Sequence, residues 1–334
     1  MSRDRKQEHI DLALDRSMQA DRSAFDAWTF DHNALPELDF DEVETHSEML
    51  GKPLTSPLLI SCMTGGTDGA FAINRRLAEA AEERGIAVGV GSQRQALEDE
   101  ETAATFEMRK YAPTVPLLAN LGAVQLNYGF GVDECRRAVD MIEADALVLH
   151  LNPLQEAIQP EGQLRFASLL PKMAEVVEAL DVPVIAKEVG SGISPATARQ
   201  LSHIGIRILD TAGTGGTSWA RIEAARAKDL DLGELFADWG IPTPECIREL
   251  RELPEIDVLA SGGLRHGIDV AKSLALGARW AGMAYPFLEP ATQSTEAVVA
   301  KIDRIQHELR IAMFCLGARD LAALEQVQVR RRQE

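Results

Sequence analysis

Short apolar runs alternate with amphipathic stretches along most of the chain. Eight of these runs are brief and rich in Val, Ile, Leu or Ala, and they occupy residues 58–63, 87–90, 116–121, 146–151, 183–189, 207–211, 257–261 and 280–284. Because parallel strands buried on both faces appear as continuous apolar runs, each run predicts a buried strand. Apolar positions at helical spacing lie between the runs, at residues 74–84, 133–143, 169–180, 195–203, 244–253 and 268–276. The pattern predicts repeated β-α units.

Eight β-α units in one chain predict an α/β fold, a TIM (β/α)8 barrel with right-handed crossovers. Polar and glycine-rich clusters follow nearly every strand, and in this fold the C-terminal strand ends build the active site. A doubly wound sheet is the alternative, but its ligand groups would gather in one crevice. We expect residues 1–55 to form an N-terminal arm and lead-in, and residues 56–334 to form the barrel, within a single domain. The long βα loop at residues 214–243 is a candidate lid.

Composition and charge narrow the function classes. Of the 334 residues, 46% are hydrophobic, which suffices for the core of one such barrel. The formal net charge of −18 argues against a nucleic-acid partner, although a local positive pocket can still bind a small phosphorylated substrate. The cysteines lack a Cys-x-x-Cys spacing, so we expect reduced thiols rather than disulfides or a zinc site. Without a signal segment or a long apolar stretch, the chain is predicted to be cytoplasmic, with no membrane partner.

The end of the fourth predicted strand is unusually polar. His150, Asn152, Gln155 and Glu156 follow one another within seven residues of a buried apolar run. That many polar groups exceed what core packing would tolerate, so this strand end is the first candidate for chemistry. The neighbouring amide and carboxylate of Gln155 and Glu156 suggest a polar handle beside a ligand for a hard metal ion.

Two glycine clusters follow the sixth and seventh predicted strands. Gly213-Thr-Gly-Gly216 is followed by Thr217, and Gly262-Gly263 is followed by Leu264. Glycines allow backbone N–H groups to approach an anion, and TIM barrels often bind phosphate near their later strands. The glycines could equally only turn the chain. No G-x-G-x-x-G motif stands at a dinucleotide position, so the pattern favours a mononucleotide phosphate.

Several cationic groups stand at positions that favour anion binding. Lys187 ends an apolar strand, where it either reaches the barrel rim or stabilises negative charge on a cofactor. Arg5, Lys6 and His9 form either a solvated arm or a clamp for an anionic substrate tail. Arg94 follows the second strand, where small neighbouring residues would let a planar ring lie flat on the strand ends.

The ordered set of strand-end motifs closely resembles type 2 isopentenyl-diphosphate isomerases over nearly the whole chain. The motifs that carry the resemblance are Arg5-Lys6-x-x-His9, Met63-Thr-Gly-Gly-Thr67, Gly89-Val-Gly-Ser-Gln-Arg94, Ala119-Asn-Leu-Gly122, His150-Leu-Asn-Pro-Leu-Gln-Glu156 with Pro160-Glu-Gly162, Lys187-Glu-Val-Gly-x-Gly192, Asp210-x-Ala-Gly-x-Gly-Gly-Thr217 and Ala260-Ser-Gly-Gly-Leu-Arg265-x-Gly267. Each motif alone is modestly specific, whereas their combination in this order is highly specific.

The resemblance implies an FMN-dependent TIM barrel that interconverts isopentenyl diphosphate and dimethylallyl diphosphate, with flavin reduced by NADPH and with Mg²⁺. It implies that FMN is held by Cys62, Met63, Thr64, Ser92, Asn120, Lys187, Thr217, Gly262, Gly263, Leu264, Ala284 and Tyr285. The residues implied to face the substrate are Arg5, Lys6, His9, Ser92, Gln93, Arg94 and Gln155, and Glu156 is the implied Mg²⁺ ligand. The family also implies a homo-oligomer, a tetramer or an octamer.

The mechanistic hypothesis follows from the difficulty of protonating an unactivated alkene. Reduced FMN is the acid–base catalyst, because its negative charge stabilises a carbocation-like state that no neutral-pH side chain could support. Lys187 tunes the charge of the flavin, and Gln155 orients the substrate, since an amide is no strong acid. His150 is assigned to the catalytic group either as a hydrogen-bonding neighbour of the substrate or as a satisfied strand-end histidine; both interpretations stay open.

Two other functions share parts of this pattern. An FMN-dependent 2-hydroxy-acid oxidase or dehydrogenase shares the barrel and the glycine-arginine phosphate region, but it needs a His base followed by an Arg. Here the order is reversed, Arg265 before His266, which argues against it. A flavin-binding barrel without catalysis would leave the polar segment at Gln155 and Glu156, and the cationic arm, without a purpose.

Overall fold

The computed structural model describes residues 2–332, except for the side chains of residues 2–5, 68 and 100. Eight parallel strands close into a barrel in the order β10-β11-β4-β5-β6-β7-β8-β9. The strands are β4 (Leu58–Ile60), β5 (Ala87–Gly89), β6 (Leu117–Gly122), β7 (Ala146–Leu151), β8 (Val184–Glu188), β9 (Ile208–Asp210), β10 (Asp257–Ala260) and β11 (Trp280–Met283). The predicted TIM barrel is confirmed, and every strand lies within its predicted run or within one residue of it.

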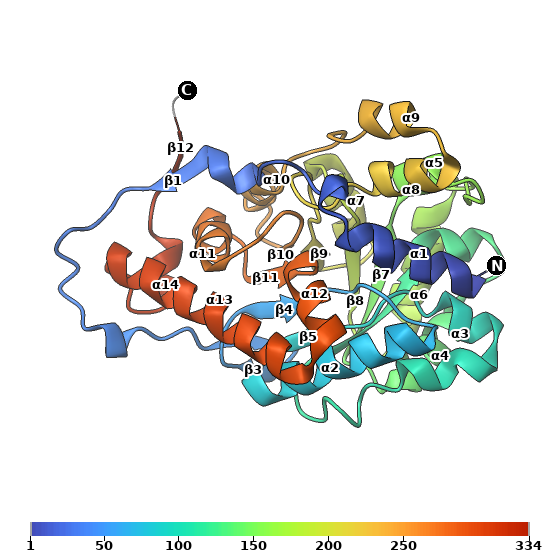
Figure 1. The fold of residues 1–334 in the computed structure, drawn as a ribbon, viewed down its shortest axis with the longest axis horizontal. Coiled ribbons are helices and arrows are strands. Elements are labelled where there is room, and N and C mark those ends of the chain that lie inside the picture. Colours follow the sequence, from blue (N-terminus) through green and yellow to red (C-terminus); the bar gives the residue numbers. More distant parts are fainter. Residues whose placement is uncertain (1, 333–334) are drawn as a thin grey trace.

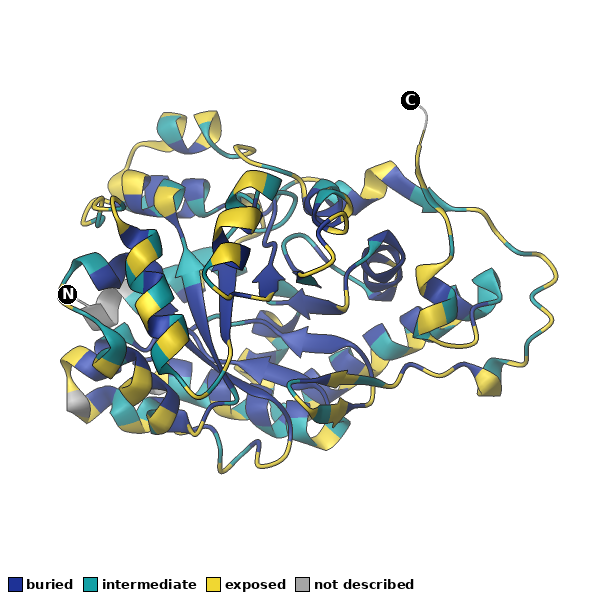
Figure 2. Ribbon diagram, turned by 180° about the vertical axis from the view of Figure 1, so that it is seen from behind, coloured by how far each residue is buried: buried dark blue, intermediate teal, exposed yellow. Residues whose placement is uncertain are grey.

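Helices surround the barrel and turn their apolar sides toward it, as Figure 2 shows by the exposed outer faces of the helices and the buried strands. The α-helices are α1 (Ser2–Leu14), α2 (Asp68–Arg84), α3 (Arg94–Glu98), α4 (Val132–Ile142), α5 (Pro153–Ile158), α6 (Leu169–Ala179), α7 (Pro195–His203), α8 (Trp219–Ala227), α9 (Leu230–Leu235), α10 (Thr243–Leu250), α11 (Gly267–Leu276), α12 (Tyr285–Gln293), α13 (Thr295–Leu316) and α14 (Leu321–Glu325). Short 3-10 helices lie at Arg16–Met18, Ala24–Ala27, Phe40–Glu42, Glu100–Phe106 and Ala123–Asn127.

Capping residues explain where the longer helices begin and end. Thr67 accepts a hydrogen bond from the backbone of Ala70 at the start of α2, and Gly85 ends this helix with a φ of 62°. Ser294 begins α13 in the same way, and Gly317 ends it with a φ of 70°. The residues 214–243, predicted as a lid, contain the two helices α8 and α9.

A hairpin closes the N-terminal end of the barrel. Strands β2 (Ser47–Met49) and β3 (Lys52–Leu54) pair in antiparallel fashion. Met49 and Leu54 pack with the first residues of the barrel strands, and Trp280 Nε1 donates to the carbonyl of Glu48 at 2.9 Å. The second apolar cluster therefore fills this end of the barrel with side chains, and it leaves the opposite end for polar groups.

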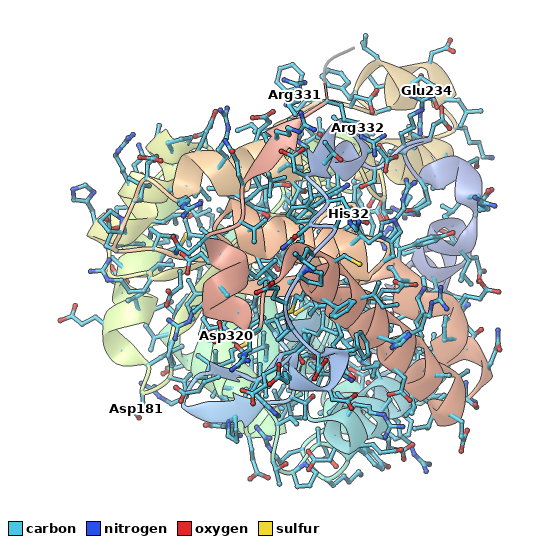
Figure 3. The ribbon with its side chains drawn as sticks, turned by 90° about the vertical axis from the view of Figure 1, so that its left-hand side faces the viewer. His32, Asp181, Glu234, Asp320, Arg331 and Arg332 are labelled. Carbon is cyan, nitrogen blue, oxygen red and sulfur yellow. The ribbon has the colours of Figure 1, made fainter. Side chains whose placement is uncertain are left out.

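A strand of the N-terminal arm pairs with the C-terminal strand on one side of the molecule. Strand β1 (Trp28–Phe30) pairs in antiparallel fashion with β12 (Val329–Arg331), with Trp28 opposite Arg331. Figure 3 looks onto this side, where Arg331 ends β12. Within the described residues 2–332, no helix is both long and apolar enough to cross a membrane. All four cysteines are free thiols, as the sequence predicted.

Candidate active site

A cavity of about 790 Å³ opens at the C-terminal ends of the barrel strands. Helix α1 (Figure 1) contributes Lys6, His9 and Ala13 to its wall. Most of the predicted site residues line this one cavity: Lys6, His9, Cys62, Met63, Thr64, Ser92, Arg94, Asn120, His150, Gln155, Glu156, Lys187, Thr217, Gly262, Gly263, Leu264, Ala284 and Tyr285. Lys6 and His9, for which the sequence leaves a solvated arm and a clamp both open, thus stand in the cavity wall.

Two predicted site residues are not placed in the cavity. The side chain of Gln93 is fully buried behind the wall, where its Nε2 donates to the carbonyl of Ala138 at 2.7 Å. Its Oε1 accepts from the backbone N–H of Asn120 at 2.9 Å. The prediction that Gln93 faces the substrate is therefore wrong, because both ends of its amide hold β6 and α4 in place. The side chain of Arg5 lies outside the described residues.

Lys187 stands at the centre of the barrel mouth and has three polar partners. Its Nζ lies 3.3 Å from Asp210 Oδ2 and donates to the carbonyl of Glu188 at 2.9 Å. It also reaches Ser261 Oγ at 3.4 Å, and Ser261 donates to the other carboxylate oxygen of Asp210. Burial raises the pKa of Asp210 although Lys187 opposes the shift. A strand-end lysine is thus buried beside a carboxylate, the pairing that a buried ammonium requires.

Asp210 was not among the predicted site residues. It ends β9, where it directly follows a buried apolar run, and it aligns with Lys187 in the register of the two neighbouring strands. The signal in the sequence was a carboxylate at one barrel strand end and a lysine at the preceding strand end. Because parallel strands place their ends side by side, this pairing could have been predicted.

His150 and Asn120 form a neutral pair on the neighbouring strands. His150 Nδ1 lies 2.9 Å from Asn120 Oδ1. Burial, followed by the positive charges of Lys187 and Lys6, lowers the pKa of His150 to about 4. The imidazole is therefore neutral near neutral pH, and its Nδ1–H donates to Asn120, which leaves Nε2 as a hydrogen-bond acceptor. Burial likewise raises the pKa of the Cys62 thiol to about 11, so this thiol in the cavity wall is protonated near neutral pH.

The polar segment after β7 forms a connected hydrogen-bond network. Asn152 Nδ2 lies 3.1 Å from both Gln155 Oε1 and Glu156 Oε1. The other oxygen of Glu156 accepts from the backbone N–H of Gln163 at 2.6 Å. Asn152 Oδ1 is buried without a partner among the described residues. Amide and carboxylate oxygens of the kind that Mg²⁺ prefers therefore line this part of the wall.

A second carboxylate, Glu223 of α8, was missed from the sequence. It is fully buried, and its Oε1 accepts from Gln155 Nε2 at 2.8 Å and lies 3.1 Å from His9 Nε2. Arg226 donates to its other oxygen at 2.6 Å and also pairs with Glu8 and Glu161. Burial opposes ionisation of Glu223, but hydrogen bonds from His9, Gln155 and Arg226 hold its pKa below the ordinary value. Glu223 of α8 thus connects α1, through His9, with α5, through Gln155.

The two glycine clusters pack directly against each other. A Cβ at Gly216 would stand 2.6 Å from the backbone nitrogen of Gly263, and one at Gly262 would stand 2.3 Å from the carbonyl of Gly213. Gly262 and Gly263 have φ values of 94° and 81°, which side chains rarely adopt. Helix α12 begins at Tyr285, but Pro286 has no N–H and the N–H of Phe287 donates to the carbonyl of Ala284 at 3.0 Å. The backbone of both glycine clusters and the start of α12 therefore line the same cavity, with few free N–H groups from the helix itself.

The rim of the cavity carries the remaining cations. Lys6 Nζ donates to the carbonyl of Ser92 at 3.0 Å and lies 5.6 Å from the centre of the Phe106 ring. Arg94 pairs with Glu98 one turn further along α3, with 2.8 Å between Nε and Oε1. Among the described residues, no cluster of three or more His, Cys, Asp or Glu side chains could hold a metal ion. A metal at this site would therefore need oxygen ligands from its substrate.

Comparison with known proteins defines the class of the chain. A family model of FMN-dependent dehydrogenases matches residues 152–331. Among solved structures, a mandelate oxidase variant with a C4a-OH-FMN adduct has the same fold, with a TM-score of 0.65 at 18% identity over 98% of this chain and 99% of that chain. Fold and matched segment define an FMN-dependent dehydrogenase barrel.

Closer relatives define the family within this class. The chain is 49% identical over 327 residues to an isopentenyl-diphosphate delta-isomerase of Nostoc sp., covering 96% of this chain and 93% of the relative. It is 48% identical over 334 residues to a protein of the same name from Cronobacter sakazakii, covering 98% and 96%. The chain belongs to the isopentenyl-diphosphate delta-isomerase family.

Proposed function

We propose that the chain interconverts isopentenyl diphosphate and dimethylallyl diphosphate with FMN and Mg²⁺, as a step of isoprenoid biosynthesis. The observation that carries this proposal is the gathering of the family's strand-end motifs around one cavity in a chain 49% identical to a named isomerase. The substrate is an anion with an apolar tail. The cations at the rim of the cavity suit the diphosphate. The apolar side chains of Met63, Leu264 and Leu288 inside the cavity suit the tail.

The glycine side of the cavity fits the phosphate of FMN. Gly262, Gly263 and Leu264 would hold it with backbone N–H groups, helped by Thr217 and by the start of α12 at Ala284 and Tyr285. The tight approach of the two glycine clusters supports this placement, because a side chain at Gly216 or Gly263 would collide with backbone. The ring would lie against Cys62, Met63, Thr64, Ser92, Asn120 and Lys187.

The chemistry at the ring edge needs a proton donor and a stabilising negative charge. Reduced FMN supplies both when bound, and NADPH is the proposed reductant. Lys187 Nζ holds positive charge at the barrel mouth, and Asp210 keeps its ammonium in place at 3.3 Å. Gln155 has its amide fixed between Asn152 and Glu223, which leaves one N–H of its Nε2 to orient the substrate. His150, being neutral, adds a hydrogen-bond acceptor rather than a charge.

The diphosphate would be held by the rim and by a metal. Arg5, Lys6, His9, Ser92 and Arg94 are the proposed ligands, and α1 would exclude water once the tail is bound. Glu156 is the proposed Mg²⁺ ligand, because Mg²⁺ prefers one or two carboxylates together with phosphate oxygens and water. The unpartnered Asn152 Oδ1 beside it supports an oxygen-rich site.

We also propose that the chain works in the cytoplasm as a tetramer or an octamer. This part of the proposal rests on the family resemblance alone. Light scattering of the purified protein after gel filtration would measure the assembly directly. A monomer under these conditions would contradict it.

An FMN-dependent 2-hydroxy-acid oxidase is the second candidate function, because the family model and the mandelate oxidase fold belong to that class. Such an enzyme needs a His base at its substrate. His266 does not line the cavity and instead lies 3.3 Å from Asp269, and Arg265 donates to the carbonyl of Ala20. These contacts favour the isomerase.

One experiment separates the two functions. The purified protein is reduced anaerobically with NADPH or dithionite, given Mg²⁺ and isopentenyl diphosphate, and assayed for dimethylallyl diphosphate. We expect product only when the flavin is reduced. Absence of product together with reduction of the flavin by lactate or glycolate would instead support the oxidase.

Substitution of Glu156 by Ala tests the metal site. We expect the Mg²⁺ concentration for half-maximal activity to rise by roughly 10- to 100-fold, because a direct oxygen ligand is lost. FMN content, measured from flavin absorbance, should stay the same. The matched control is Glu175→Ala on the exposed side of α6. Loss of flavin in the Glu156 variant would show that this carboxylate does not serve the metal.

A further inference from the structure

The glycine loop after β9 is covered by a segment of the N-terminal arm. Residues 18–24, which we call the clamp segment, run antiparallel to the loop, with Gln19 opposite Thr217. The backbone N–H of Ala20 donates to the carbonyl of Gly216 at 2.8 Å, and that of Ser218 donates to the carbonyl of Met18 at 2.8 Å. The clamp segment therefore pairs with the glycine loop after β9 through one antiparallel β-bridge.

The second glycine cluster is fastened to the same segment. Ser23 Oγ donates to the carbonyl of Gly263 at 2.8 Å, and Arg265 Nη2 donates to the carbonyl of Ala20 at 2.6 Å. Gly215 has a φ of 112°, and a Cβ there would stand 2.7 Å from the backbone nitrogen of Ala24. A side chain at Gly215 would therefore not fit against the clamp segment. A glycine-rich loop loses much backbone conformational entropy when it becomes ordered. The hydrogen bonds from the clamp segment help to offset this entropy loss.

One side chain of the clamp segment reaches the cavity itself. Gln19 lines the cavity and is only 9% exposed. Its Oε1 accepts a hydrogen bond from the hydroxyl of Thr217 at 2.9 Å, and its Nε2 donates to the carbonyl of Ala13 at 3.3 Å. Thr217 is a proposed phosphate ligand, so Gln19 fixes the orientation of a side chain in the phosphate subsite.

We propose that Gln19 is a positioning residue of the cofactor phosphate subsite and that the clamp segment orders together with that subsite. The inference rests on the proposed placement of the FMN phosphate against the glycine loops. Its consequence is a reciprocal coupling, because a ligand that favours the ordered loop favours the ordered clamp segment by the same factor. Helix α1, which carries Lys6 and His9, is joined to the clamp segment through a single short 3-10 helix. FMN binding therefore prepares the substrate rim as well.

The first test compares FMN with riboflavin, which lacks the phosphate, in the flavin-free protein. Gln19→Glu should weaken FMN binding by roughly 100-fold, because it places a negative charge beside the phosphate in a partly buried site. Riboflavin binding should change by less than about threefold, since no charge repulsion arises. Gln19→Met keeps the volume and should weaken FMN binding by about 3- to 10-fold through the lost hydrogen bond. Gln7→Glu on α1 outside the cavity lining is the matched control, and flavin fluorescence measures all dissociation constants.

The second test measures the ordering of the clamp segment. Trypsin cleaves after exposed Arg16, two residues before the segment, and after exposed Arg22, within it, and mass spectrometry follows the fragments. FMN should slow both cleavages in the wild type and should slow them much less in Gln19→Glu at equal FMN. Cleavage after Lys110, in the loop before β6, should be unaffected by FMN and serves as the control.

The outcomes are separable. If Gln19→Glu weakens FMN and riboflavin equally, or weakens neither, or if FMN leaves cleavage after Arg16 and Arg22 unchanged in the wild type, the inference is wrong while the proposed function stands. If the wild type binds no FMN, the proposed function and this inference both fail.

Discussion

The two ends of the barrel are built from the same eight strands and differ in almost every physical property. The N-terminal end is filled by apolar side chains and capped by the β2–β3 hairpin, with Met49 only 1% exposed. The C-terminal end surrounds a cavity of about 790 Å³ whose wall holds buried charges, neutral amides and glycine backbone. Lys187 and Asp210 are buried there at 8% and 3% exposure.

The difference shows how one fold separates stability from chemistry. Apolar burial at the closed end contributes folding free energy without any directional requirement. Buried ion pairs at the open end contribute little net stability, because desolvation offsets their attraction. They do, however, hold charges at fixed positions, which is what catalysis by electrostatic preorganisation needs. Substitutions at the two ends should therefore have separable consequences.

Lys187→Met should have the largest effect and should act on the open end alone. Loss of the ammonium removes the positive charge at the ring, and we expect kcat to fall by about 1,000-fold. The melting temperature should change little, because Asp210 can take up a proton once its partner is gone, its pKa being already raised by burial. Anaerobic isomerase assays and thermal melts measure both. The variant Lys110→Met, at an exposed lysine outside the cavity, is the control, and equal loss of activity in both variants would contradict the assignment.

Met49→Ala should produce the opposite result at the closed end. Removing a fully buried side chain from the plug leaves a cavity, and we expect the free energy of unfolding to fall by about 2–5 kcal/mol. The kcat of the folded protein should stay within about twofold, since the strand ends that carry the site are untouched. Urea unfolding and isomerase assays give the two numbers. Glu48→Ala, on the exposed face of the same strand, is the control; a large drop in kcat for Met49→Ala would show that the two ends are coupled.

The titration of His150 should make the stability of the open end depend on pH. Its pKa is lowered from 6.5 to about 4 in the folded protein, so the folded state binds this proton less well than the unfolded state. Stability that is fully present above the unfolded value is lost as the pH falls through this window, by about 2 kcal/mol between about pH 7 and about pH 5. The variant His150→Gln should lack this contribution. Urea unfolding at both pH values measures it, and parallel pH dependence in the two proteins would contradict the buried neutral state.

Glu98→Gln should give the smallest effect, at the rim. The Arg94–Glu98 pair is partly exposed, so breaking it changes free energies by less than about 1 kcal/mol. Freed from its partner, Arg94 should bind the diphosphate better, and we expect KM for isopentenyl diphosphate to fall by about two- to threefold with kcat unchanged. Raising the salt concentration should diminish the difference. Glu79→Gln breaks a similar pair on α2 outside the cavity and should leave KM as it is.

The sequence predicted the barrel well because buried parallel strands leave a strong signal. All eight apolar runs became barrel strands, and the polar residues that follow them gathered around one cavity. The direction of each strand end is set by the chain itself, so a residue such as Lys187 could be assigned to the mouth without knowing its neighbours.

Partners and side-chain directions could not be predicted as well. Gln93 directly follows Ser92, which lines the cavity, yet it turns behind the wall because Ala138 and Asn120 offer backbone partners there. Glu223 lies on a lid helix whose position depends on packing between distant segments, so its contact with Gln155 left no local pattern. The place of Gln19 over the glycine loop depends likewise on contacts across the whole chain.

The bond between Ser23 and Gly263 joins positions 240 residues apart, and this separation fixes an order of events during synthesis. The clamp segment leaves the ribosome first, but its partners in the loops after β9 and β10 emerge only when most of the chain has been made. Contacts of such long range also slow the folding search. If the FMN phosphate binds these loops as proposed, the nascent barrel must assemble its early strands without the cofactor, and flavin insertion would be one of the last steps of maturation.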